Sequence, residues 1–88
     1  MTASVVTLTT LYEGGLAEPA VRRNVIAAAR ALGERTGVEV ADVSATDSAL
    51  SVTIAGDRLV AMGFAAELRR ATNAWHHARF GADLWPSG

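Results

Sequence analysis

The sequence predicts a single α+β domain, residues 1–88, built as a two-layer sandwich in which two helices cover one face of a small sheet. Short β-branched runs alternate with longer segments of helical periodicity, in the order strand, helix, strand, strand, helix. Half of the 88 residues are hydrophobic and 19% are charged, which is the composition of a globular chain. This length suits one domain and leaves no room for a second.

The first strand is predicted over residues 4–11, because nearly all of them are β-branched or leucine. Side chains alternate between the two faces of a strand. The inward set is Val6 and Leu8, and the outward set is Val5, Thr7 and Thr9.

The first helix is predicted from Pro19 to about Thr36, since proline suits a first helical turn. Its apolar residues fall on one face when placed at about 100° per residue. They are Val21, Val25, Ala28, Ala29 and Leu32. Gly37 is the expected end, because glycine readily adopts the left-handed conformation there.

Residues 38–45 and 50–55 are predicted to form a β-hairpin around the short linker 46–48. The second of these strands alternates regularly, with Leu50, Val52 and Ile54 facing inward. In the first strand of the hairpin, Val40 and Val43 would point to opposite faces under strict alternation. A bulge near Ala41 and Asp42 would bring both valines to the same face.

The second helix is predicted to begin after an N-cap at Asp57 and to end at Gly81. The short tail 82–88 either forms a very short fourth strand or folds back on the domain. With a fourth strand the fold would be ferredoxin-like, a split βαβ arrangement. The inward phases together predict the core: Val6, Leu8, Val21, Val25, Leu32, Leu50, Val52, Ile54, Val60, Phe64, Leu68 and Trp75.

Composition excludes several classes of function. The chain has no cysteine, which removes disulfides, thiolate metal sites and thiol catalysis. No apolar run approaches the roughly 20 residues that cross a bilayer, so no membrane partner is expected. The N-terminus lacks the features of a secretory signal, and the expected location is cytoplasmic.

The segment Tyr12-Glu13-Gly14-Gly15 lies between a strand and a helix, where phosphate-binding loops occur. Such loops need several glycines with a lysine or the spaced glycines of a dinucleotide site. The chain contains no lysine, and Glu13 and Glu18 would repel an anion. The segment is therefore interpreted as a turn.

His76 and His77 follow Trp75 and are the only histidines. Adjacent helical residues point about 100° apart, so the pair cannot chelate one ion as residues i and i+4 can. Acid–base catalysis would need an orienting partner, and Asp83 lies beyond the predicted helix end. No catalytic residue, cofactor or metal is expected, although this end of the helix remains the alternative site for ligand binding or catalysis.

All eight basic residues are arginines, and nine acidic residues give a net charge of −1. The pairs Arg22-Arg23 and Arg69-Arg70 support a weaker alternative, a nucleic-acid-binding module. The predicted open sheet face, however, has no aromatic side chain on which bases could stack. Nucleic acid is therefore not an expected partner.

Two surfaces remain without a predicted partner: the sheet face away from the helices, which is expected to be uncharged, and the outward side of the second helix. The candidate interface residues are Val5, Thr7, Thr9, Ser51, Thr53, Leu59, Met62, Ala66, Arg69 and Phe80. Apolar residues bordered by arginine are typical of interfaces. We therefore expect a non-enzymatic protein–protein interaction or assembly module that is homo-oligomeric, with a dimer favoured.

Overall fold

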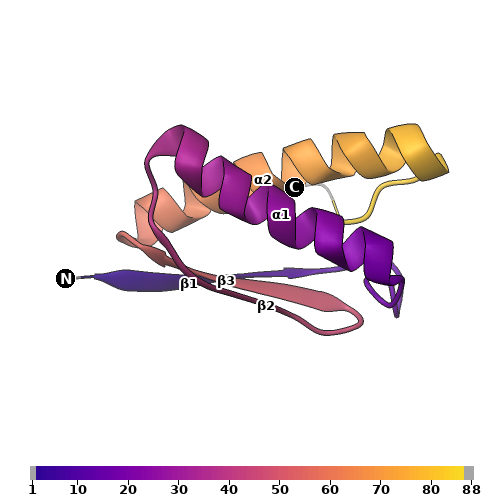
Figure 1. Cartoon of the computed structure of the whole chain (residues 1–88), viewed down its shortest axis with the longest axis horizontal. Coiled ribbons are helices and arrows are strands. Elements are labelled where there is room, and N and C mark those ends of the chain that lie inside the picture. The colour runs from indigo at the N-terminus through magenta and orange to yellow at the C-terminus, as the bar shows by residue number, and fades with distance from the viewer. Residues whose placement is uncertain (1, 87–88) are drawn as a thin grey trace.

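The computed structural model describes residues 2–86, and its elements follow the expected order. They are β1 (Ala3–Thr9), α1 (Pro19–Thr36), β2 (Val40–Ala45), β3 (Ala49–Ala55) and α2 (Arg58–Phe80). Both helices lie on the same face of the sheet, α1 over β2 and α2 over β1 (Figure 1). The predicted α+β class is confirmed, and the second face of the sheet carries no helix in the described chain.

The three strands are antiparallel and lie in the order β1-β3-β2. The β2–β3 register shifts between Val40 and Asp42, which is the predicted bulge. This shift lets Val40 pair with Ile54 while Val43 pairs with Val52, so both valines reach the helix-covered face.

The ends of both helices also agree with the sequence analysis. The Asp57 side chain accepts a hydrogen bond from the backbone N–H of Val60 at 3.0 Å, as an N-cap does. Gly37 and Gly81 end the two helices with φ of 75° and 77°, a conformation that favours glycine.

Residues 82–86 fold back against the end of α2 and form no strand. Leu84 and Trp85 are fully buried there, and the Leu84 carbonyl accepts a hydrogen bond from the Leu11 N–H at 2.8 Å. Of the two alternatives for the tail, the folded-back one is correct over this range, and residues 87–88 lie outside the described chain.

The core lies between the sheet and the two helices and contains most of the residues that the sequence assigned to it. Val60 and Trp75 are the corrections. Val60 is 40% exposed because it lies on the flank of the first turn of α2, and Ala61 faces the core instead. Trp75 is only half-buried. The core residues missing from the predicted list are Leu16, Ala29, Ala61, Leu84 and Trp85.

Candidate functional site

The open face of the sheet is more polar than the sequence suggested. Its central pairs are Val5 with Thr53 and Thr7 with Ser51, and the Thr7 and Ser51 hydroxyl oxygens are 3.4 Å apart. Thr9 continues the same outward phase of β1. Asp42 pairs with Thr53 and therefore shares this face. The expectation of an uncharged face is thus wrong at β2, and Val5 is the one large exposed apolar side chain on the three strands.

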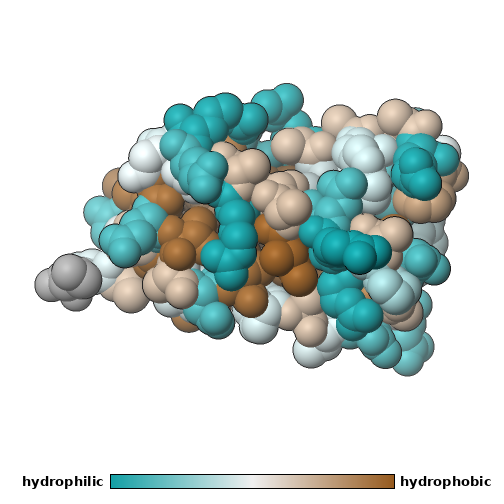
Figure 2. Space-filling model, viewed as in Figure 1, coloured by the Kyte–Doolittle hydropathy of each residue, from teal (hydrophilic) through white to brown (hydrophobic). Residues whose placement is uncertain are grey.

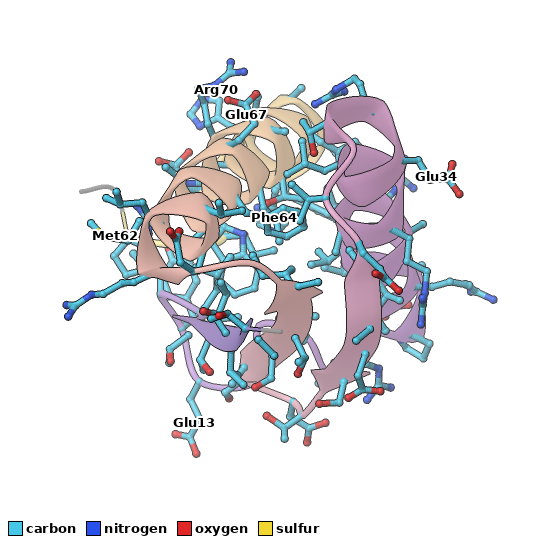
Figure 3. The ribbon with its side chains drawn as sticks, turned by 90° about the vertical axis from the view of Figure 1, so that its left-hand side faces the viewer. Glu13, Glu34, Met62, Phe64, Glu67 and Arg70 are labelled. Atoms are coloured by element: carbon cyan, nitrogen blue, oxygen red, sulfur yellow. The ribbon has the colours of Figure 1, made fainter. Side chains whose placement is uncertain are left out.

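The outward side of α2 carries a cluster that we call the outer stripe: Leu59, Met62 and Ala66. Leu59 is 78% and Met62 59% exposed, and Ala66 is also exposed. Arg69, one turn further along, is half-buried. Figure 3 shows Met62 pointing away from α1, whereas Phe64 lies between the two helices. The stripe therefore faces solvent on the side of the molecule opposite α1.

Phe80, the remaining interface candidate, does not join this stripe. It is the last residue of α2 and lies about 27 Å along the helix axis from Met62. Its ring packs instead against Trp75 and His76, with ring centroids 6.2 Å and 4.7 Å apart. The guanidinium carbon of Arg79 is 5.7 Å from the same ring. Phe80 thus belongs to an aromatic cluster at the C-terminal end of α2.

The two histidines fix the turn that follows α2. His76 Nδ1 is 2.5 Å from the Ala82 carbonyl oxygen, and His77 Nδ1 is 3.3 Å from Asp83 Oδ1. The expectation that Asp83 lies out of reach is wrong, because the left-handed turn at Gly81 reverses the chain. Within residues 2–86 no group of three or more His, Cys, Asp or Glu side chains is placed to hold a metal ion.

A groove of about 410 Å³ lies where α1 begins and α2 ends. Its α2 wall consists of Trp75, Arg79 and Phe80. The α1 side contributes residues between Glu18 and Asn24. Neither histidine lines the groove. The residues of the alternative site are therefore in two places, since Trp75 lines the groove and the histidines contact the turn after α2.

The glycine segment that precedes α1 is used structurally. The Gly14 N–H donates to the Ser48 hydroxyl at 2.7 Å, and the Leu16 N–H donates to the Asp47 carbonyl at 2.7 Å. These bonds tie the segment to the β2–β3 turn and bury Leu16 completely. The amides that a phosphate would need are therefore already engaged at these positions.

The two arginine pairs lie on different helices, and one member of each contacts an acid. Arg22 lies 3.8 Å from the carboxylate of Asp47. Arg70 forms an ion pair with Glu67 one helical turn away. The hydrogen bond from Arg70, followed by its charge, holds the pKa of the Glu67 carboxyl below its usual value. Figure 3 places Glu67 and Arg70 on the outer surface of α2.

Asn73 and Thr72 anchor the folded-back tail, a role that the sequence analysis missed. Asn73 Oδ1 accepts hydrogen bonds from the N–H groups of Leu84 at 2.9 Å and Trp85 at 2.8 Å. Its amide nitrogen donates to the Trp85 carbonyl at 3.1 Å. The Trp85 indole N–H donates to the Thr72 hydroxyl at 2.7 Å. The available signal was the apolar pair Leu84-Trp85 in a short polar tail.

Comparison with protein-family models finds no match for the chain, and comparison with curated proteins finds no significant relative. Neither helix in the described range combines the length and apolarity that a membrane-spanning segment requires. The function must therefore be argued from the surfaces themselves.

Proposed function

We propose that this chain is a non-enzymatic protein–protein interaction or assembly module that acts as a homodimer. The observation that carries the proposal is the outer stripe of α2, where Leu59 and Met62 expose more than half of their surface. Arg69 beside the stripe supplies a polar rim, which is the arrangement found at interfaces.

Physical considerations favour a second copy as the partner. A domain of this size buries only about 60–65% of the surface of its unfolded chain, so its stability margin is small. Each Å² of apolar surface removed from water contributes about 25 cal/mol. Two-fold pairing of identical chains is the commonest way to cover such a surface.

Sedimentation equilibrium over a range from about 1 to 500 µM, which spans typical weak dimer affinities, tests the proposal. We expect the wild type to dimerise and Met62→Glu to raise the dissociation constant at least about tenfold, because the new charge would be buried. Ala27→Glu, on the exposed side of α1, adds the same charge elsewhere and should leave dimerisation unchanged. A wild type that stays monomeric throughout the range contradicts the proposal.

A second candidate function is small-ligand binding in the groove between the start of α1 and the end of α2. It is favoured by the convergence of Trp75, Phe80 and Arg79: the rings would stack on a planar ligand, and Arg79 would pair with its carboxylate against the opposing charge of Glu18 on the other wall. An NMR titration with aromatic carboxylic acids tests it, with benzoate as the first probe. Saturable shifts centred on the Trp75 indole support this function, whereas unchanged spectra at millimolar benzoate count against it.

A further inference from the structure

The two edges of the sheet are protected to very different degrees. β2 is interrupted by its bulge and carries Asp42, and Glu39 immediately precedes it. β1 runs through seven residues without a bulge, a proline or a charged side chain. Natural edge strands usually avoid pairing with other chains by means of such charges and bulges. β1 is therefore the edge that is open to another strand.

The hydrogen bonds at the two ends of β1 identify which backbone groups are free. The Thr10 N–H donates to the Ser48 carbonyl, and the Gly56 N–H donates to the Thr2 carbonyl. The N–H and C=O groups of the even-numbered residues of β1 therefore point toward β3. The odd-numbered residues direct their N–H and C=O groups toward the free edge: Ala3, Val5, Thr7 and Thr9.

The described part of the chain uses very little of this edge. β1 pairs with β3 alone among residues 2–86, and the tail meets the edge through the bond from Leu11 to Leu84, beyond the end of the strand. Within residues 2–86, the positions that a fourth strand would occupy along β1 are therefore open.

The outer stripe of α2 lies on the same side of the molecule as this edge. α2 packs over β1, and Figure 3 shows Met62 projecting on that side, away from α1 and β2. The opposite side, with α1 and β2, appears in Figure 2 as apolar patches divided and surrounded by hydrophilic residues. The free backbone edge and the exposed apolar residues thus lie on the same side of the molecule and together form the candidate surface.

We propose that a second copy of the chain occupies this surface, with β1 antiparallel to its two-fold mate in a six-stranded sheet and the two α2 stripes in contact. This inference rests on the proposed function and names its interface. β1 carries no charge, so a two-fold axis brings no like charges together along the paired strands.

Amide hydrogen exchange on the wild type provides the first test, since it needs no substitution. The N–H groups of Val5 and Thr7 should become protected as protein concentration rises, because no residue of the described range 2–86 pairs with them and dimerisation would. Those of Val6 and Leu8 face β3 and should be protected at every concentration. A dimer in which Val5 and Thr7 exchange as they do in the monomer overturns the inference.

Lysine substitutions provide the second test. Val5→Lys alters a side chain that points to solvent on the open face, and we expect it to raise the dissociation constant at least tenfold. Ser44→Lys makes the matched change on the β2 edge, and Thr53→Lys makes it on the central strand of the same face. Both should dimerise normally. Loss of the dimer in Thr53→Lys, with or without its loss in Val5→Lys, would instead indicate face-to-face stacking and overturn the edge inference, because Val5 and Thr53 are neighbours on that face.

These outcomes distinguish a failure of the β1 edge pairing from a failure of the proposed homodimer. A wild-type chain that remains monomeric removes the homodimer and, with it, the edge pairing. A wild-type dimer that Val5→Lys leaves intact removes the edge pairing alone, and the assembly module still stands. In this second case, Met62→Glu shows whether the dimer forms through the outer stripe, because the substitution leaves β1 unchanged.

Discussion

One polar side chain holds residues 84 and 85 in place. Asn73 presents both a carbonyl and an amino group, and it bonds two N–H groups and one carbonyl of the tail. These three backbone groups are thereby satisfied without a β-ladder. Thr72 then accepts the indole N–H, which allows Trp85 to be fully buried. The tail is therefore an integral part of the core.

Asn73→Ala should lower the free energy of unfolding by about 2–4 kcal/mol, because it leaves buried backbone groups without partners. Urea titration followed by circular dichroism, at one fixed protein concentration, measures this. Asn24→Ala is the matched control on the exposed side of α1 and should change stability by less than about 0.5 kcal/mol. A loss below 1 kcal/mol for Asn73→Ala, close to the effect of a surface substitution, would mean that burial of Trp85 and its bond to Thr72 hold the tail without Asn73.

Among the elements, α2 connects the core to the outer stripe. Phe64 is 5% exposed and lies between the helices, on the inward side of the same helix that exposes Met62. Phe64→Ala should destabilise the domain by about 3–5 kcal/mol, through lost burial and the cavity left behind. The same urea titration measures it. An effect under 1 kcal/mol, far below that range, would show that the helix does not pack through this residue.

The helices and strands could be predicted because their signals are local. Alternation fixes the faces of β3, the phase change places the bulge, and glycines mark both helix ends. The sequence could not decide between the two alternatives for the tail. Its position depends on Asn73, which is distant in sequence from the residues it binds. Leu16 was missed for a similar reason, because its burial follows from a bond to the hairpin turn.

The candidate site was predictable only in part. Helical phase correctly grouped Leu59, Met62 and Ala66 as an exposed stripe. Phe80 shares the same phase but lies apart from the stripe in the aromatic cluster, because phase gives the angle around a helix and takes no account of distance along it. The free edge of β1 could not be predicted either, since alternation assigns faces to a strand but does not specify its neighbours.

At the scale of the whole molecule, the charge distribution favours a protein partner over a nucleic acid. The net charge is −1, and the two arginine pairs lie on separate helices. Arg22 and Arg70 each contact a carboxylate, which weakens their attraction for a phosphate. The open sheet face offers threonine and serine hydroxyls in place of the stacked aromatics of RNA-binding sheets.

Binding to polyanions should therefore be weak and should come from few phosphate contacts. We expect labelled single-stranded RNA and duplex DNA to bind with dissociation constants above about 10 µM near physiological salt. Fluorescence anisotropy over a salt series measures both the affinity and its salt dependence, whose slope reports the number of phosphates neutralised. Sub-micromolar binding that falls steeply with added salt would support the nucleic-acid-binding alternative. Comparing R22A/R23A with R69A/R70A would then assign the contact, because each double substitution removes two charges from one helix.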